Sequence, residues 1–470
     1  MSDRELLFST ASHLGRLLQQ RQVSSVELTR LYLQALETDG YALNAVAEIT
    51  ADLALAQAMQ ADREIAAGQV RGPLHGVPYG AKDLLATRDI PTRWGSPAHR
   101  DQVFDYDATV IERLRDAGAV LVAKLAMIEL AGGGGYEYAA ASLHGPCRNP
   151  WDRQRWAGGS SSGSGAAVGA GLVGFAIGTE TWGSITVPSA YCNVSGLRPT
   201  YGRVPRYGAM ALCWTLDKIG PMARSAEDCG SILAAIAGHD PRDPSSLPDR
   251  FTFQPEAPAR RRLRLGVLPR HHEVTATEGR FGAALEVLRA LGHTTEEIAL
   301  PAFPYDRAAG TIVTAEGSSA FEQLIRGPRL AELADTRQQA GLLAGLAMPA
   351  VDYLRALRVR ALAAPAAVAV FERCDVLVAP TLLHGASPID RSIQEGEEDP
   401  GNGGPGNLLG WPSISIPMGF DDDSLPLGLE LIGPPDGEAM LLALAMAFQE
   451  ATDWHRLTPP ADAALSRTAP

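Results

Sequence analysis

Cysteines in paired spacing are absent from this chain of 470 residues. It has five cysteines, an odd number, at Cys147, Cys192, Cys213, Cys229 and Cys374. Their spacing suits neither a disulfide framework nor a zinc site, so we expect reduced, mostly buried thiols. The ten histidines likewise show no metal-ligand spacing with carboxylates or thiols. The sequence therefore predicts no metal and no other cofactor.

Long hydrophobic runs are also absent. The longest purely apolar segments have about ten residues, which is too short to span a bilayer. The first residues, MSDRELLFSTASHLGRLL, are charged and amphipathic and contain no uninterrupted apolar stretch with a cleavage site. They give no indication of a signal peptide. We therefore expect a soluble cytoplasmic protein that does not associate with a membrane.

Positive charge is scarce. The net charge is −13 and the isoelectric point is near 5.3, whereas a nucleic-acid partner requires clustered lysine and arginine. The one dense basic patch, ARRRLR at 259–264, leads into LGVLP and is interpreted as the solvated approach to a strand. The charge pattern therefore predicts no nucleic-acid partner.

The composition that is present is typical of a large, loop-rich globular enzyme. Apolar residues make up 46% of the chain, which also has 48 glycines and 33 prolines. Helical spacing covers 3–20, 24–37 and 51–68. Ser24 stands three residues before Glu27, which predicts a capping box at the start of the second of these helices.

Beyond residue 70 the pattern changes. Up to about 220, short apolar runs such as AVLVAK and GFAIGT alternate with glycine-rich turns and a helical segment at 108–117. This alternation is typical of an α/β sheet protein. After about 225 we expect strands near 263–268 and 375–380 and helices near 280–291, 339–372 and 437–451. We expect an exposed loop at 394–406, after which come the apolar runs PSISIPM and LGLELIG.

The stretch WAGGSSSGSGAAVGAG, at 156–171, has the composition of a flexible linker. It also contains GSSSG, which matches a nucleophile elbow centred on Ser161, but PWDRQRW before it is a poor strand candidate. GAGLVG at 169–174 matches a dinucleotide-binding pattern but follows a helix-like run instead of a strand. This stretch alone therefore predicts neither a nucleophile elbow nor a dinucleotide-binding site.

Three segments read together resemble the amidase signature family of amide hydrolases. They are GVPYGAKDLL (76–85), GGSSSGSGAAVGAGLVGFAIGTETWGS (158–184) and CNVSGLRPTYGRV (192–204). In that family a serine of the Gly/Ser segment precedes a second serine by 24 positions, and Ser160 and Ser184 have this separation. CRNPWDR, VLVAPT, GWPSISIPMG and LPLGLELIG also look like family segments. The resemblance covers roughly residues 20–455.

The resemblance implies an α/β fold, the amidase signature fold, with a large mixed, mostly parallel central sheet covered by helices on both faces. It implies a single domain over 1–470, with a helical N-terminal segment at about 1–68, a signature core at about 70–225 and a variable helical substrate-pocket region at about 300–372. No cofactor is implied.

The resemblance also assigns chemical roles. Ser184 is the expected nucleophile, neutral Lys82 the base, and Ser160, expected in a cis peptide, the proton relay between them. Backbone N–H groups of Thr181, Trp182, Gly183 and Ser184 would form the oxyanion hole. These roles suit the chemistry, because an amide carbonyl is a poor electrophile and needs an activated nucleophile and oxyanion donors. Lysine can act as the base only if burial lowers its pKa.

Further residues are expected around this triad. The predicted substrate-binding residues are Gly132, Gly133, Gly134, Tyr136, Tyr138 and Trp182. The predicted supporting residues are Asp83, Ser161, Glu180 and Arg198, and Arg198 is expected to pair a buried carboxylate such as Glu180.

Two departures from the family pattern guide the expected substrate. Trp182 stands where glycine is usual, and Thr186 stands where many members have arginine. An aromatic wall without that cation predicts hydrolysis of a small neutral amide, anilide or carbamate (urethane) through an acyl-enzyme, with esterase side activity. The expected partner is this small molecule alone, and a homodimer is left open.

Three alternatives stay open. Trp182 could pack into the core instead of lining the pocket. The chain could be a transamidosome-type subunit that releases ammonia from glutamine for a partner. It could also be a non-catalytic scaffold of the same fold, although the intact set of Lys82, Ser160 and Ser184 argues against that interpretation.

Overall fold

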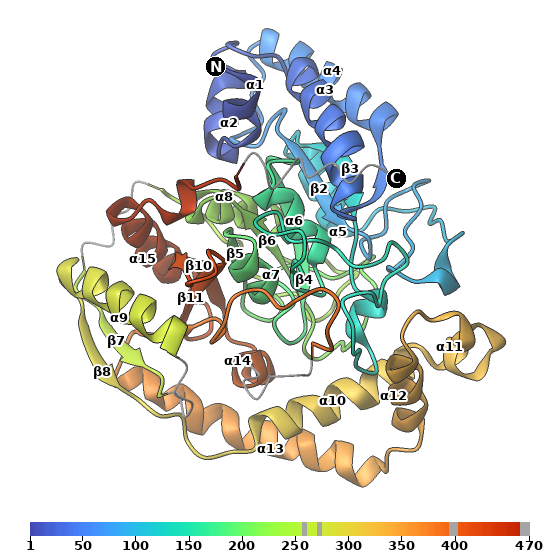
Figure 1. The fold of residues 1–470 in the computed structure, drawn as a ribbon, viewed down its shortest axis with the longest axis vertical. Coiled ribbons are helices and arrows are strands. Elements are labelled where there is room, and N and C mark those ends of the chain that lie inside the picture. Colours follow the sequence, from blue (N-terminus) through green and yellow to red (C-terminus); the bar gives the residue numbers. More distant parts are fainter. Residues whose placement is uncertain (256–260, 270–274, 394–402, 461–470) are drawn as a thin grey trace.

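A computed structural model describes residues 1–255, 261–269, 275–393 and 403–460. Its centre is an 11-stranded sheet (Figure 1). The strands are β1 (Val46–Ile49), β2 (Pro78–Lys82), β3 (Val120–Leu125), β4 (Phe175–Glu180), β5 (Ser195–Arg198), β6 (Lys218–Ala223), β7 (Arg264–Val267), β8 (Thr294–Glu297), β9 (Val376–Pro380), β10 (Ser413–Phe420) and β11 (Pro426–Ile432). Their order across the sheet is β1-β3-β2-β4-β6-β5-β10-β11-β9-β7-β8.

The predicted α/β class and mixed sheet are confirmed, but the expectation of a mostly parallel sheet is wrong. Six of the ten neighbouring strand pairs are antiparallel. The connection between β10 and β11, from Phe420 to Pro426, illustrates the reason. A link this short joins antiparallel neighbours, whereas a parallel pair needs a crossover of a dozen or more residues.

Helices cover both faces of the sheet. They are α1 (Asp3–Leu7), α2 (Ala11–Gln19), α3 (Ser25–Ala35), α4 (Ala51–Ala66), α5 (Thr109–Asp116), α6 (Ser162–Gly169), α7 (Thr186–Tyr191), α8 (Ala226–Ile236), α9 (Thr275–Ala290), α10 (Tyr305–Ala320), α11 (Glu322–Arg326), α12 (Thr336–Leu346), α13 (Ala350–Val368), α14 (Gly403–Leu409) and α15 (Glu438–Ala451). Side chains alternate across a strand. Phe175 and Ile177 of β4 accordingly enter one hydrophobic cluster and Ala176 another.

The helices deviate from the predicted boundaries where the chain has caps or prolines. The expected helix 3–20 is two helices, because Thr10 caps α2 through its side chain. The expected helix 339–372 is divided before Pro349, which precedes α13. The capping box of Ser24 and Glu27 is present. Of the loop expected at 394–406, residues 394–402 lie outside the described residues, and the remainder begins α14.

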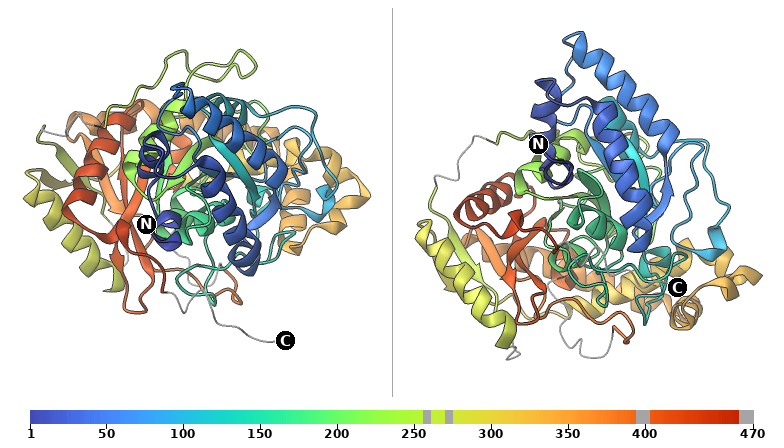
Figure 2. Two further views of the ribbon diagram at one scale, coloured as in Figure 1. Left: turned by 90° about the horizontal axis from the view of Figure 1, so that it is seen from above. Right: turned by 45° about the horizontal axis from the view of Figure 1, so that its top comes forward.

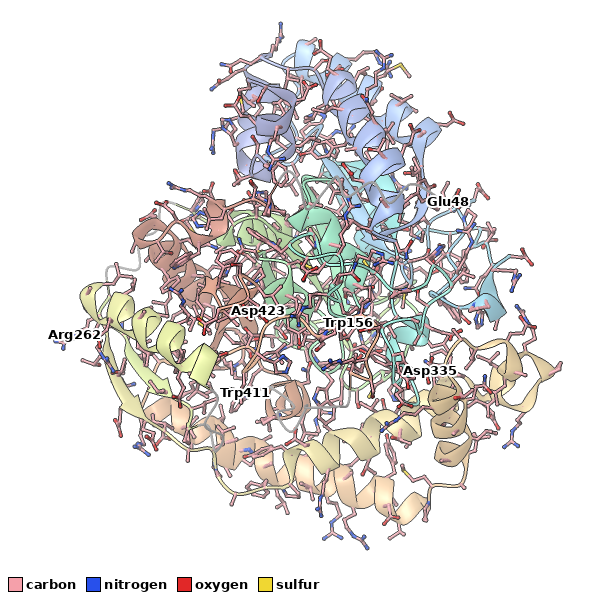
Figure 3. The ribbon with its side chains drawn as sticks, in the orientation of Figure 1. Glu48, Trp156, Arg262, Asp335, Trp411 and Asp423 are labelled. Atoms are coloured by element: carbon pink, nitrogen blue, oxygen red, sulfur yellow. The ribbon has the colours of Figure 1, made fainter. Side chains whose placement is uncertain are left out.

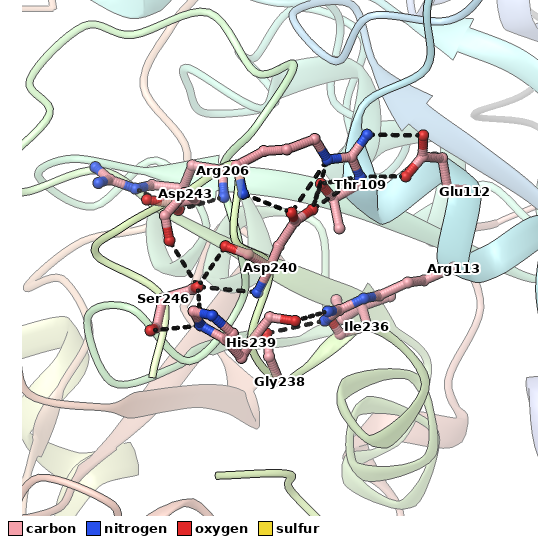
Figure 4. Close-up of polar contacts among 11 residues, drawn as sticks. Thr109, Glu112, Arg113, Arg206, Ile236, Gly238, His239, Asp240, Asp243 and Ser246 are labelled. Carbon is pink, nitrogen blue, oxygen red and sulfur yellow. Dashed lines mark hydrogen bonds and ion pairs between the residues drawn. The ribbon is translucent and has the colours of Figure 1, made fainter. Parts of the chain in front are cut away.

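The N-terminal helices and the group α10–α13 lie at opposite ends of the molecule (Figures 1 and 2). A polar network connects α5 with the segment after α8 (Figure 4). In it Thr109 donates a hydrogen bond to Asp240 at 2.5 Å, and Arg113 donates to the carbonyl of Ile236 at 2.6 Å. The division of the chain into the three expected regions stays a prediction.

Two predictions from composition can be compared with the structure. All five cysteines are buried free thiols, as expected. None of the helices in the described ranges has the length and apolar character needed to cross a bilayer.

Candidate active site

Lys82 is the last residue of β2 and is completely buried. Its Nζ lies 2.8 Å from Ser160 Oγ, 2.9 Å from Ser161 Oγ and 3.0 Å from Thr179 Oγ1. Burial lowers the pKa of Lys82 to about 7, although the carboxylates of Asp217 and Glu180 oppose this shift. A substantial fraction of the side chain is therefore a neutral amine near neutral pH.

The hydroxyl partners of Lys82 orient its lone pair. Ser161 Oγ donates to the carbonyl of Thr179 at 3.1 Å and accepts from the backbone N–H of Thr179 at 3.2 Å. The hydroxyl hydrogen of Ser161 is therefore already donated to Thr179, so Ser161 Oγ can only accept a hydrogen bond from Lys82. A neutral amine has two N–H donors and one lone pair. With Ser161 and Thr179 accepting the two N–H groups, the lone pair is left facing the hydroxyl of Ser160.

The Gly/Ser-rich stretch is closely packed, and it is not a linker. The peptide bond between Gly159 and Ser160 is cis, and α6 begins at Ser162. A Cβ placed at Gly163 would lie 2.4 Å from the carbonyl oxygen of Ala45. Its lack of a side chain therefore lets the backbone approach closely and bring the serines beside Lys82.

The second serine of the motif follows the end of β4. Gly183 has a φ of +121°, a conformation that glycine adopts readily, directly before Ser184. The carboxylate of Glu180 accepts hydrogen bonds from the backbone N–H groups of Ile185 and Thr186 at 2.9 and 3.0 Å. The carbonyl of Ser184 accepts from the N–H of Ser161 at 3.2 Å. These contacts place Ser184 next to the two serines that contact Lys82.

The predicted pair of Arg198 with Glu180 is confirmed. Arg198 Nη1 lies 2.7 Å from Glu180 Oε1, and both side chains are completely buried. Asn407 of α14 also donates to Glu180, at 2.9 Å. Burial raises the pKa of Glu180, but Arg198 and the other donors outweigh this effect and lower that pKa to about 2. The pair is thus an ionised, fully buried support for the loop before Ser184.

Substituting Arg198→Met is expected to lower the free energy of unfolding by about 3–5 kcal/mol, because the carboxylate of Glu180 would remain buried without its cation. Chemical denaturation would measure the change. The matched control is Arg326→Ala, which breaks an exposed i,i+4 pair with Glu322 and should cost only about 0.5 kcal/mol. Equal costs for the two variants would contradict this role.

Beside Ser184 lies a cavity that several predicted residues line. The lining includes Thr181, Trp182, Gly183, Ser184, Gly132 and Tyr136. Gly133 and Gly134, which were also expected there, stand between the lining residues Gly132 and Gly135 but are not lining residues themselves. Tyr138 is not a lining residue either, and it is 46% exposed.

Trp182 lines the cavity and is also partly packed against the main hydrophobic core. Its carbonyl oxygen and indole contact α14, where a Cβ at Gly403 would lie 2.5 Å from that oxygen. Thr186 has a different environment. It is buried, and its backbone N–H and hydroxyl both face Glu180. The missing arginine at position 186 is therefore no guide to the charge of the cavity.

The pocket region expected at about 300–372 includes α10, but the sequence did not identify the residues of α10 that line the cavity, which are Gly310, Val313 and Thr314. It also did not identify Trp156 and Leu382 as lining residues. Of these lining residues, Trp156 lies near the middle of the molecule (Figure 3). Asp335, which is also labelled there, caps the N-terminus of α12. The α10 residues lie outside the three segments that carry the resemblance, at 76–85, 158–184 and 192–204. Only the spatial fold brings them to Ser184.

The other supporting residues contact the site indirectly. Asp83 accepts a hydrogen bond from the N–H of Arg93 at 3.0 Å and lies 3.5 Å from the buried ammonium of Lys124. Burial raises the pKa of Asp83 to about 6, against the effect of Lys124. Thr181 donates to Asp217 at 2.5 Å. Across the described ranges, no cluster of three or more histidine, cysteine or acidic side chains could hold a metal ion.

Comparisons with known proteins agree with this geometry. The family model Amidase matches residues 27–442. A glutamyl-tRNA(Gln) amidotransferase subunit from an Azoarcus species is 40% identical over 97% of this chain and 100% of that protein. The protein of the same name from Moorella thermoacetica is 38% identical over 97% and 99%.

Among solved structures, the native peptide amidase from Stenotrophomonas maltophilia is similar, with a TM-score of 0.83 and 33% identity. The similarity covers 95% of this chain and 97% of that one.

These relatives correct two expectations. A stand-alone hydrolase of small neutral amides, anilides or carbamates is contradicted, because the curated relatives are named as a subunit of an amidotransferase. The expectation of a small molecule as the only partner, without nucleic acid, is contradicted as well, because that name includes a glutamyl-tRNA. The first error arises because an uncharged cavity wall can accept the amide group of many molecules and does not identify the molecule that carries it.

The family itself was predicted correctly from the spacing of the lysine and the two serines. The match of the family model over most of the chain, the full-length relatives and the shared fold all agree. This chain belongs to the Amidase family.

Proposed function

We propose that this chain is the amide-hydrolysing subunit of an amidotransferase, which releases ammonia from glutamine for transfer to a glutamyl-tRNA held by a partner. The observation that carries the proposal is the 38–40% identity, over nearly all of both chains, to two proteins of that named activity. An enzyme that acts on a glutamyl-tRNA works where translation occurs, so we also propose a cytoplasmic location.

The arrangement of Lys82, Ser160 and Ser184 supports the first half of the reaction. Neutral Lys82 accepts the proton of Ser160, and Ser160 accepts the proton of Ser184 as Ser184 Oγ attacks the side-chain carboxamide carbon. Backbone N–H groups at 181–184 would stabilise the resulting oxyanion. Proton return from Lys82 through Ser160 to the nitrogen lets the C–N bond break, which yields ammonia and an acyl-enzyme on Ser184.

Lys82, Ser160 and Ser184 also carry out the second half of the reaction, which is hydrolysis of the acyl-enzyme. A water molecule attacks the acyl-enzyme, its proton passes through Ser160 to Lys82, and Ser184 leaves as the alkoxide that takes the proton back. The products are glutamate and regenerated enzyme, so atoms and protons balance. Ser184 is a residue of the cavity wall, which allows a substrate carbonyl to reach it.

The cavity constrains how glutamine would bind. No described residue of its lining has a formal charge. Burying the α-ammonium and α-carboxylate there without partners would cost several kcal/mol. The carboxamide would therefore enter the cavity while the charged end of glutamine stays at its mouth.

The test of the function is ammonia release from glutamine by the purified chain, with the Ser184→Ala variant as the blank. Ammonia and glutamate should form in equal amounts, and only with Ser184 present. Asparagine, which is one methylene shorter, tests whether the reach from the mouth to Ser184 matters. Hydrolysis of a neutral amide without any hydrolysis of glutamine would overturn the proposal.

The rate should depend on pH through Lys82. Burial lowers the pKa of this lysine to about 7, and its neutral form is the base, so deprotonation activates the enzyme. We expect kcat/KM to rise about tenfold per pH unit below pH 7 and to level off above it. Lys218 is buried too, with its pKa lowered to about 7 mainly by burial, so Lys218→Gln is the control and should keep this inflection. A rate that falls between pH 6 and 8 would contradict a lysine base.

Thr179→Val tests the orientation of the Lys82 lone pair. Loss of the hydroxyl 3.0 Å from Nζ frees the amine to turn away from Ser160, so kcat should fall about tenfold or more with little change in KM. The pH inflection should also move lower, because one acceptor for the ammonium form is lost. Thr179→Ser should restore both values. An unchanged inflection in the valine variant would leave Thr179 with only a packing role.

A further inference from the structure

Asp217 has a carboxylate beside the catalytic cavity that takes no part in the proposed proton path. It comes directly before β6, and the antiparallel register of β4 with β6 pairs Glu180 with Lys218. The residue after β4, Thr181, therefore stands opposite Asp217, just beyond the ends of both strands. Thr181 Oγ1 donates a hydrogen bond to Asp217 Oδ1 at 2.5 Å. The sheet thus places a carboxylate against the first residue of the loop that ends at Ser184.

The other oxygen of Asp217 holds a second part of the cavity wall. Asp217 Oδ2 accepts hydrogen bonds from the backbone N–H groups of Leu212 and Cys213, both at 2.9 Å. Leu212 and Thr181 both line the cavity beside Ser184. One carboxylate therefore fixes two segments of that wall relative to each other.

The loop at 181–184 makes few backbone hydrogen bonds. In the ranges that the structure describes, none of its four N–H groups donates a hydrogen bond to a protein group. Backbone N–H groups away from bulk water are almost always paired, and all four residues line the cavity, so these donors are free to bind a substrate oxygen. The last two carbonyl groups of the loop accept from the N–H groups of Val187 and Ser161. The first two accept none from the described residues.

Two carboxylates hold the two ends of this loop. Glu180 accepts hydrogen bonds from the N–H groups of the two residues that follow Ser184. At the beginning of the loop, where the backbone itself forms no hydrogen bond to described residues, the corresponding contact is that of the Thr181 hydroxyl with Asp217. Donors to an oxyanion are effective when they are already oriented before charge develops. The contact of Thr181 with Asp217 supplies that orientation.

We propose that Asp217 is a positioning residue, whose carboxylate acts through the hydroxyl of Thr181 to aim the backbone N–H groups of 181–184 at the oxyanion. The proposal rests on the proposed function in one respect, that Ser184 is the nucleophile. Asp217 contacts neither the substrate nor the reacting atoms.

The rate at which a fluorophosphonate labels Ser184 tests the proposal without depending on glutamine. Ser184 Oγ bonds to phosphorus, fluoride leaves, and negative charge develops on the phosphoryl oxygen as it would on an amide oxygen. Thr181→Val removes the hydroxyl but keeps the branched shape of the side chain. The labelling rate should fall about tenfold or more, and so should kcat for glutamine with little change in KM. Thr181→Ser, which keeps the hydroxyl, should restore both rates.

Thr109→Val is the matched control. The hydroxyl of Thr109 is also buried and also donates to a carboxylate, that of Asp240, at 2.5 Å. Thr109 is not a lining residue of the cavity. This variant should lower the melting temperature as Thr181→Val does, yet label at the wild-type rate.

A double-variant cycle shows whether Asp217 acts through Thr181. Asparagine has the size of aspartate but only one acceptor oxygen, so Asp217→Asn cannot accept hydrogen bonds on both sides and should also label more slowly. Adding Thr181→Val to it should cause little further loss, because both changes break the same contact. If Asp217→Asn does not fold, the two Thr181 variants and the Thr109 control still decide the matter.

Several outcomes would overturn the proposal. They are unchanged labelling of Thr181→Val, an equal loss in Thr109→Val, no recovery in Thr181→Ser, and losses that multiply in the double variant. A wild-type chain that is not labelled at all would overturn both this proposal and the proposed function. Labelling that responds as expected, in a chain that hydrolyses no glutamine, would refute the proposed function alone.

Discussion

Replacing Ser184 with alanine is expected to abolish hydrolysis of glutamine, lowering kcat by about 10⁴-fold or more. The variant lacks the only atom that forms the acyl-enzyme in the proposed mechanism, and the rest of the site cannot substitute for it. Ser184 is partly exposed at the cavity wall, so removal of its hydroxyl leaves no buried group without a partner. The fold and its stability should therefore be unaffected.

Two measurements separate a lost nucleophile from a damaged fold. A fluorophosphonate probe should label the wild type and not the Ser184→Ala variant, which also excludes a non-catalytic scaffold. The matched control is Ser189→Ala, five residues along the chain, where the buried hydroxyl donates to the carbonyl of Ile185 at 2.7 Å. This control should keep its label and most of its activity. Substantial turnover by Ser184→Ala would refute the assignment.

The parts of the site that the sequence predicted are residues that can be recognised from their spacing and their immediate neighbours in the sequence. Ser160 and Ser184 stand at a family-specific separation, and Lys82 ends an apolar run where a lysine is out of place unless it is buried. All three positions lie in the short segments that carry the family resemblance, so they can be identified from the sequence without knowing how those segments pack together. The pairing of Glu180 with Arg198 was predictable for a related reason, because a buried carboxylate needs a cation.

The parts that were missed depend on contacts between distant segments. Sheet direction is set by how strands meet, and a run such as PSISIPM is equally apolar in a parallel or antiparallel pair. Gly310 and Val313 reach the cavity only because α10 folds over it. A single substitution in a motif is also a poor guide to a pocket. Thr186 is adjacent in sequence to the cavity residue Val187, yet its own side chain faces Glu180.

Lys82→Met is the second substitution with a large expected effect. Methionine preserves the length and apolar packing of the buried stem but removes the base, so kcat should fall about 10²–10⁴-fold. Burial lowers the pKa of the lysine to about 7, so the wild type gains activity as pH rises through this value. The variant should lose that dependence together with the rate, and a pH–rate profile from pH 5 to 9 would measure both.

Two further variants distinguish a base from a structural cation. Lys124 is another fully buried lysine, 2.6 Å from Thr92 Oγ1 and 3.5 Å from the carboxylate of Asp83. Its replacement by methionine should lower stability yet leave the pH inflection of the remaining activity near 7. Lys82→Arg retains a positive charge but cannot become neutral at these pH values, so it should be as inactive as Lys82→Met. Recovery of activity in Lys82→Arg would show that position 82 needs a cation, and the proton path from Ser184 through Ser160 would then have to end at another group.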